Sequence, residues 1–133
     1  MLKAAYFDVT AIIELLRGDK GILAVVETYK EFYTGALAAA EIIGADEFLV
    51  GKKIVSSRKT RGLIESFKIL PVTKEDAEKA GEMIGRVKSA GKHIGIDEAV
   101  AAAQCFRKGL ILVTKNRAVN QIKSIVDIKL HKL

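Results

Sequence analysis

Three acidic residues stand in apolar surroundings at separate places in this 133-residue sequence. Asp8 follows the apolar run AAYF, Glu41 lies within ALAAAEIIGA, and Asp97 follows HIGI and opens an alanine-rich stretch. Two carboxylates about 4 Å apart repel by roughly 4 kcal/mol at an effective dielectric constant near 20, so three of them together require protons, cationic partners or a bound cation. Oxygen ligands without a supporting His or Cys cluster suit Mg²⁺ or Mn²⁺. Such an ion, held between carboxylates and a phosphodiester, activates water.

Each of these acids also has a purely structural interpretation. Asp8 and Asp97 stand where a helix N-cap is expected, accepting a hydrogen bond from a backbone N–H two or three residues on. Glu41 would then be a solvent-facing residue of an apolar helix. The residue types alone leave both interpretations open.

Short apolar segments alternate with helical segments along the chain. We expect strands at 4–7, from 31 onward, at 67–72, at 110–114 and at 126–130, and helices at 22–29, 38–45, 46–67, 73–91, 96–109 and 116–123. Strands that are apolar on both faces and alternate with helices indicate a parallel sheet covered on both sides. The prediction is one α/β domain over residues 1–133, a three-layer α/β/α sandwich with a central, mainly parallel sheet. Ligands bind outside the carboxyl ends of such strands, where the acids are expected to meet.

Two helix starts follow from local chemistry. Thr73 with Asp76 three residues later forms a capping box, and Gly91 suits the end of that helix. Asp46 and Glu47 are expected to open the helix over 46–67.

Composition narrows the class of protein. Lys and Arg outnumber Asp and Glu by 22 to 16, which gives a formal net charge of +6 and favours acidic partners such as nucleic acid. No apolar run reaches the length of a membrane helix, and the run before Asp8 is too short for a signal peptide. The single Cys105 lies among alanines and is expected to be a buried, reduced thiol. These features predict a cytoplasmic protein that does not associate with membranes.

The motifs around the acids resemble those of the PIN-domain family, in particular the small VapC-like toxin ribonucleases, over essentially the whole chain. FDVTAII is similar to the opening motif of that family, with Asp8 as the first acid and Thr10 as the hydroxyl that supports it. LAAAEIIGA resembles the helix that carries the second acid, Glu41. HIGIDEAVAAAQ resembles the helix start that carries the third, Asp97.

The fourth acidic position of the family differs in this chain. LILVTKNRAVNQI is similar to the strand and turn that deliver a fourth acid, and Thr114 matches the pattern. The position two residues later is Asn116, and the later position that is Asp in some members is Val119. The resemblance therefore implies three acids and an amide.

The resemblance implies a Mg²⁺- or Mn²⁺-dependent endoribonuclease that is a homodimer and is held inactive by a small antitoxin protein. The catalytic residues that it implies are Asp8, Glu41, Asp97 and Asn116, of which Asp8, Glu41 and Asp97 are the metal ligands. Supporting roles fall to Thr10, Thr114 and Glu98. Glu98 follows Asp97 but is displaced by roughly 100° around the helix. It is therefore expected either to interact favourably with the helix dipole or to support the metal ligands.

Basic residues provide candidate contacts to RNA. The stretch 51–62 contains Lys and Arg but no acid, so it is either a solvated helix face or a track for phosphates. The candidates are Lys52, Lys53, Arg58, Lys59 and Arg61 in that stretch, and Lys115 and Arg117 beside the expected site.

Two other functions are compatible with parts of the pattern. The chain could be a PIN-like scaffold that binds RNA with weak or no catalysis, which the missing fourth acid favours. Phosphotransfer enzymes of the HAD type also place Asp after the first strand, but they use a second Asp two residues later, where this chain has Thr10. A metal titration that Asp8→Asn abolishes would distinguish the nuclease from the scaffold.

Overall fold

A five-stranded parallel sheet forms the centre of the computed structural model, which describes residues 3–51 and 57–133. The strands are β1 (Ala4–Phe7), β2 (Glu31–Gly35), β3 (Lys68–Leu70), β4 (Ile111–Thr114) and β5 (Lys129–Lys132), in the spatial order β3-β2-β1-β4-β5. Each described pairing is parallel. The carboxyl ends of the strands therefore lie at one edge, as the α/β prediction requires.

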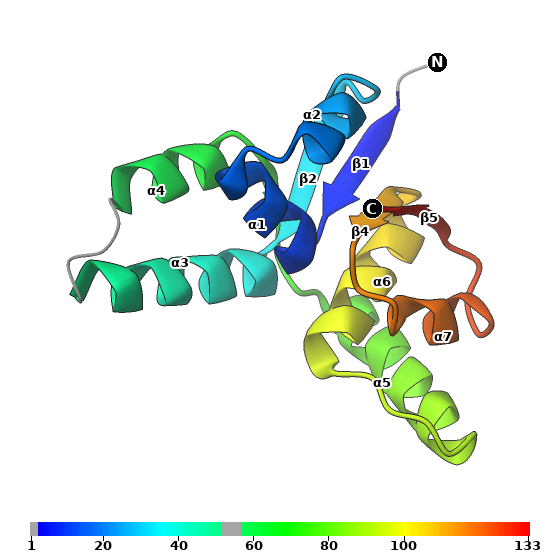
Figure 1. Ribbon diagram of the computed structural model, residues 1–133. Helices are drawn as coiled ribbons and strands as arrows, with labels where there is room; N and C mark the ends of the chain where they lie inside the picture. The colour runs from blue at the N-terminus through cyan, green and yellow to red at the C-terminus, as the bar shows by residue number, and fades with distance from the viewer. Residues whose placement is uncertain (1–2, 52–56) are drawn as a thin grey trace.

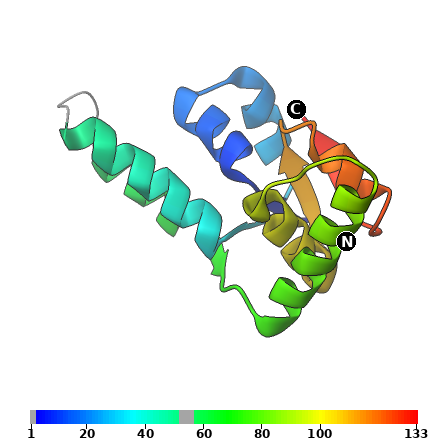
Figure 2. The same ribbon diagram turned by 90° about the horizontal axis from the view of Figure 1, so that it is seen from below.

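Helices cover both faces of the sheet (Figure 1). They are α1 (Val9–Arg17), α2 (Lys20–Val26), α3 (Ala36–Gly51), α4 (Ser57–Glu65), α5 (Lys74–Ser89), α6 (Ile96–Lys108) and α7 (Val119–Lys123). Side chains alternate along β1, so that Ala5 and Phe7 pack with α1 to α4 whereas Tyr6 packs with α5 to α7. Figure 2 shows α3 projecting from one side of the sheet, with α5 and α6 on the other. The predicted three-layer α/β/α sandwich is confirmed, with a wholly parallel sheet in the described residues.

The capping box at the start of α5 is confirmed and has a second role. Thr73 Oγ1 accepts from the Asp76 N–H at 3.1 Å, and an Asp76 carboxylate oxygen accepts from the Thr73 N–H at 3.0 Å. Asp76 also accepts two hydrogen bonds from Arg107, at 2.7 and 3.0 Å. Burial raises the pKa of Asp76, but Arg107 and Thr73 outweigh it and hold the pKa below its ordinary value. This pair ties α5 to α6, the helix that carries Asp97.

The single helix predicted over 46–67 is wrong. Asp46 and Glu47 lie inside α3, which begins at Ala36, so no helix begins at Asp46. Asp46 is buried and accepts from Thr60 Oγ1 at 2.8 Å, and Glu47 pairs with Arg61 at 2.6 Å. These acids join α3 to α4 instead of capping a helix.

A buried polar network lies beneath the junction of β2 and α3. Tyr6 Oη donates to Gln104 Oε1 at 2.7 Å, and Gln104 Nε2 donates to the carbonyl oxygens of Leu70 and Pro71 at 3.1 and 3.2 Å. A Cβ at Gly35 would overlap Tyr6 Oη and Gln104 Oε1. A side chain at position 35 would therefore displace this buried, hydrogen-bonded pair, directly before the helix that carries Glu41.

Two further expectations concern membranes and the cysteine. No helix within the described ranges is long and apolar enough to cross a membrane. Cys105 is a free thiol buried in α6, and burial raises its pKa well above the ordinary value.

Candidate active site

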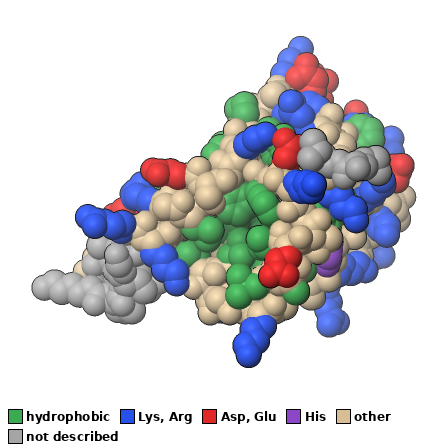
Figure 3. Space-filling model, turned by 90° about the horizontal axis from the view of Figure 1, so that it is seen from above, with side chains coloured by type: hydrophobic (Ala, Val, Ile, Leu, Met, Phe, Trp, Pro, Cys, Tyr) green, Lys and Arg blue, Asp and Glu red, His purple; other side chains and the backbone are tan. Residues whose placement is uncertain are grey.

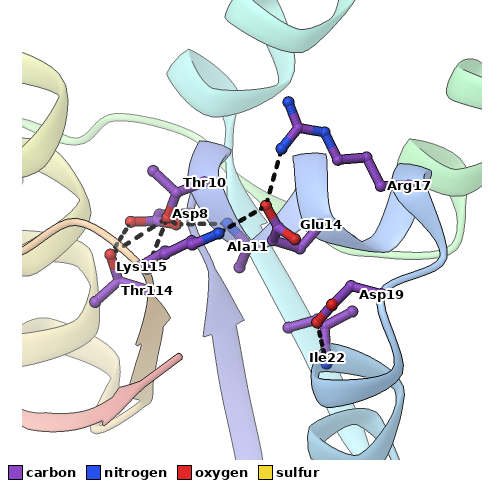
Figure 4. Close-up of polar contacts among 9 residues, drawn as sticks. All are labelled: Asp8, Thr10, Ala11, Glu14, Arg17, Asp19, Ile22, Thr114 and Lys115. Carbon is purple, nitrogen blue, oxygen red and sulfur yellow. Dashed lines mark hydrogen bonds and ion pairs between the residues drawn. The ribbon is translucent and has the colours of Figure 1, made fainter.

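Asp8 lies at the carboxyl end of β1 and is also the N-cap of α1. Its Oδ1 accepts from the Ala11 N–H at 3.0 Å and from Thr10 Oγ1 at 2.6 Å (Figure 4). Its Oδ2 accepts from Thr114 Oγ1. The capping interpretation is thus correct for Asp8. Helix capping does not account for the hydrogen bond that Asp8 accepts from the Thr114 hydroxyl of β4.

Two hydroxyls connect Asp8 to the turn after β4. Thr10 Oγ1 accepts from the Lys115 N–H at 2.8 Å, and Thr114 Oγ1 accepts from the Asn116 N–H at 2.9 Å. Each hydroxyl donates in turn to a different oxygen of Asp8, which fixes the carboxylate plane. Burial raises the pKa of Asp8 above its ordinary value, although the two hydroxyls and the backbone N–H groups act in the opposite direction.

The start of α6 presents two carboxylates to the same place. Its N-cap is Gly95, which has no capping side chain, so the N-cap prediction for Asp97 is wrong. A Cβ at Gly95 would lie 2.6 Å from Asp97 Oδ1 and would overlap Glu98 Oε2. Both carboxylates therefore fold back over this glycine, in spite of the angle between them on the helix.

Glu98 has a more direct place in the site than its sequence position indicates. Its Oε1 accepts from Asn116 Nδ2 at 2.9 Å, whereas its Oε2 is buried with no hydrogen-bond partner in the described part of the chain. A buried carboxylate oxygen without a partner is costly. The glycine two residues before Asp97 was the available sequence signal, because it leaves room for this side chain to turn back.

Asn116 uses both ends of its amide within the chain. Its Nδ2 donates to Glu98, and its Oδ1 accepts from the Ala118 N–H at 3.0 Å. The predicted metal-supporting amide thus orients Glu98 and shapes the turn after β4.

Glu41 is the acid that α3 contributes to the site. Its side chain is exposed, and its pKa is raised first by partial burial and then by Asp97, Glu98 and Asp8. Acids from three separate segments therefore lie within electrostatic range of one another. Asp8, Asp97 and Glu98 line a hollow of about 40 Å³ together with Leu37 and Asn116 (the acidic hollow). Glu41 lies at its margin and lines the neighbouring groove.

The donor set fits a hard divalent cation. As the side chains stand, no three His, Cys, Asp or Glu residues within 3–51 and 57–133 lie close enough together to hold a metal ion. The acids are nevertheless all oxygen donors, Glu98 has a buried oxygen without a hydrogen-bond partner in the described residues, and Gly95 lets the Asp97 and Glu98 carboxylates lie together over its backbone. After burial, the neighbouring carboxylates are the next cause of the raised pKa of Glu41, and a bound cation would relieve that repulsion.

Cationic side chains line the approach to the acids on one side. Lys115 Nζ and Arg17 both pair with Glu14, at 3.3 and 3.2 Å (Figure 4). Lys115, Arg17 and the exposed Arg117 line a groove of about 510 Å³ that reaches Asn116. The two predicted RNA contacts beside the site are therefore next to the acidic hollow.

The basic residues of the 51–62 stretch lie elsewhere. Lys52 and Lys53 fall outside the described residues, and Arg58, Lys59 and Arg61 lie on α4. Lys59 Nζ donates to a carbonyl oxygen of α1 at 3.2 Å, and Arg61 pairs with α3. None of the three lines the acidic hollow.

A larger apolar groove separates α1 from α3 and α4. It has a volume of about 750 Å³ and is lined by the apolar side chains of Val9, Ile13, Leu16, Ile42 and Ala45. Figure 3 shows hydrophobic side chains gathered in a hollow, with lysine and arginine side chains around its margin. The groove reaches Glu41, so it borders the acidic hollow.

Comparisons with known proteins agree with this fold. The model of the PIN domain matches residues 5–124. Ribonuclease VapC10 of Mycobacterium tuberculosis is 28% identical over 78 residues, and this match spans 59% of each chain. The rest of each chain lies outside this match.

Several solved structures share the fold at low sequence identity. VapBC2 from Rickettsia felis, bound to a DNA fragment from its promoter, has a TM-score of 0.77 at 14% identity and 98% coverage of both chains. VapBC-1 from Haemophilus influenzae has a TM-score of 0.76 at 20% identity and 97% coverage of both. DNA-bound VapBC from Salmonella typhimurium has a TM-score of 0.75 at 18% identity, covering 99% of this chain and 98% of that one.

Proposed function

The chain belongs to the PIN-domain family, and from that premise we propose that it is a Mg²⁺- or Mn²⁺-dependent endoribonuclease. Its substrate is RNA, and its role is that of the toxin in a toxin–antitoxin pair, as a single cytoplasmic domain over residues 1–133. The observation that carries this proposal is the convergence of Asp8, Glu41, Asp97 and Glu98 at the carboxyl edge of the sheet. Repulsion among these carboxylates has no counterion within the acidic hollow.

In this proposal Asp8, Glu41 and Asp97 hold the divalent ion. A divalent ion held there would polarise the scissile phosphate and make a water molecule more acidic. Asp8 is oriented for this role by the hydroxyls of Thr10 and Thr114. Glu41 comes from α3, and its carboxylate already lies within interaction range of Asp97, Glu98 and Asp8.

The remaining residues position the substrate and move the proton. Glu98 is held by Asn116 through one oxygen and lines the acidic hollow, where its carboxylate would accept a proton from the attacking water. Lys115 and Arg117 bind phosphates on either side of the scissile bond. The water oxygen would form the new bond to phosphorus as the bond from phosphorus to the leaving ester oxygen breaks, and the proton that Glu98 takes from the water would then pass to that leaving oxygen.

We also propose that a small antitoxin protein occupies the apolar groove between α1, α3 and α4. Proteins of the same fold have been crystallised as VapBC complexes. The groove is apolar and borders Glu41, so a segment bound there reaches the acidic hollow. Ile96 and Leu37 are exposed apolar residues beside the acids, and they offer a surface to a second copy in the expected homodimer.

The test is cleavage of one structured and one unstructured RNA by the purified protein in Mg²⁺ or Mn²⁺. We expect cleavage that EDTA and Asp97→Asn both abolish. Asp127→Asn is the matched control, because Asp127 is exposed in the turn before β5 and lies outside the acidic hollow. Equal cleavage by Asp97→Asn would remove the acids from the mechanism.

The second candidate is a PIN-like RNA-binding scaffold, which Asn116 at an acidic position of the family favours. A scaffold of this kind would bind RNA without cleaving it. It would also show no saturable binding of Mg²⁺ or Mn²⁺ at the acids, so Asp8→Asn would leave a metal titration unchanged. The phosphotransfer alternative requires a different family, and the PIN-domain match does not support it.

A further inference from the structure

A basic pocket adjoins the acidic hollow on the side of β5. It has a volume of about 330 Å³ and is referred to below as the β5 pocket. Its lining residues are Thr114, Lys115, Asn116, Arg117, Asn120, Lys132 and Leu133. We propose that this pocket binds a backbone phosphate of the RNA substrate, next to the scissile one, with Lys132 and Asn120 as contacts. This inference rests on the proposed ribonuclease function.

The sheet places Lys132 at the same edge as the acids. Thr114 and Lys132 are paired in register at the ends of β4 and β5. The Leu133 N–H donates to the Thr114 carbonyl oxygen at 2.9 Å, which holds the end of β5 against the turn. On the other wall, the Asn120 N–H donates to the Arg117 carbonyl oxygen at 3.1 Å. The pocket is thus formed by backbone that is hydrogen-bonded on both sides.

Charge distinguishes the β5 pocket from the acidic hollow. The side chains of Lys115, Arg117 and Lys132 line it, and no Asp or Glu side chain of the described residues does. Lys115 pairs with Glu14, whereas Arg117 and Lys132 have no ion-pair partner in the described residues. Cations and an amide N–H₂ are the groups that most often contact nucleic-acid phosphates. The two hollows have opposite charge and meet at Asn116.

The spacing suits a phosphate close to the cleavage position. Asp8 follows β1, and Lys132 ends β5, which is the second strand away in the order β1-β4-β5. Two strand spacings amount to roughly 10 Å, which is within reach of a neighbouring phosphate of the same RNA strand. A phosphate held there fixes the direction in which the strand crosses the acids. It conveys no base information.

The experiment measures RNA binding in an Asp97→Asn background, so that the RNA stays intact. A fluorescent single-stranded oligoribonucleotide is titrated by anisotropy over a series of salt concentrations. Lys132→Gln is expected to weaken binding several-fold and to lower the slope of log K against log salt by about 0.7, the value for one phosphate contact on a single strand. The loss should be the same for unrelated RNA sequences.

The matched control is Lys129→Gln, at the opposite end of the same strand. Lys129 is exposed and does not line the β5 pocket, so this variant removes the same charge from the same strand without touching the site. Asn120→Asp is a second variant, nearly isosteric, that puts a negative charge into the pocket and is expected to weaken binding more than Lys132→Gln. Circular dichroism verifies that each variant is folded.

A neutral phosphate in the RNA locates the contact. Oligonucleotides that carry a single methylphosphonate are compared position by position. When the neutral group stands at the contacted phosphate, Lys132→Gln should cause no further loss of RNA affinity. If Lys132→Gln and Lys129→Gln bind equally well and no such position exists, the pocket proposal is wrong although the ribonuclease proposal stands. If the parent protein neither binds nor cleaves RNA, both proposals fail together.

Discussion

Glu41→Gln should have opposite effects on stability in the absence and in the presence of divalent metal. In the metal-free protein, Glu41 is an exposed carboxylate whose pKa is raised by partial burial, Asp97, Glu98 and Asp8. Replacing it with neutral glutamine relieves the repulsion. We expect the metal-free variant to be more stable than the wild type at neutral pH by about 0.5–1 kcal/mol, since solvent screening limits interactions of exposed charges.

The pH dependence has a definite sign. A carboxyl group whose pKa is higher in the folded than in the unfolded state stabilises the fold below the unfolded pKa, and this contribution is lost as pH rises through the folded pKa. Metal-free wild type should therefore match Glu41→Gln in acid and fall below it as pH rises through the raised pKa of Glu41.

Bound metal should make the wild type more stable than Glu41→Gln. An ion at a hundred times its Kd adds about 2.7 kcal/mol to the stability of the folded state. If loss of one carboxylate ligand weakens binding tenfold or more, the variant gains at least about 1.4 kcal/mol less than the wild type under saturating conditions. The two stability curves should cross as Mg²⁺ or Mn²⁺ is added.

Urea denaturation at several metal concentrations and pH values measures the effect without any RNA. Glu65→Gln is the matched control, because it makes the same change on an exposed residue of α4 that lies outside the acidic hollow. It should change neither the metal-free stability nor the gain from metal. The reasoning is refuted if Glu41→Gln behaves like Glu65→Gln without metal, or if it gains as much stability from metal as the wild type.

Two further substitutions test how the fold supports the site. Gly35→Ala should lower the free energy of unfolding by about 2–5 kcal/mol in urea denaturation, because the new methyl group overlaps two buried hydrogen-bonded oxygens. Gly44→Ala, in the open middle of α3, should raise it by up to about 1 kcal/mol. Equal effects of the two substitutions would contradict the packing at the β2–α3 junction. Thr114→Val removes a hydrogen bond to the Asp8 carboxylate and should raise the pKa of Asp8 further, destabilise the fold by about 2–3 kcal/mol and weaken Mg²⁺ binding. Thr60→Val removes a comparable bond on α4 and should cost similar stability with unchanged Mg²⁺ binding in a thermal-shift titration; the same loss of metal affinity in both variants would mean that the effect is one of global stability.

Local sequence patterns predicted several of the strands and one helix start. The apolar runs at 4–7 and 110–114 predicted buried strands, and Thr73 with Asp76 predicted a helix start that the structure confirms. These signals depend on residues close together in the chain, namely short continuous apolar runs and capping within one turn. The helix over 46–67 was mispredicted because acids that bind a second helix resemble acids that cap one.

The fold class, the PIN-like motifs and the identity of the acids expected at the edge of the sheet were all predictable from the sequence. Tertiary structure alone decided how the side chains there are used. It turned Glu98 back over Gly95, engaged both ends of the Asn116 amide, and brought Lys132 beside Thr114. These contacts join residues from different elements, and their geometry depends on strand register and helix packing. The spacing of residues along the chain does not encode that geometry.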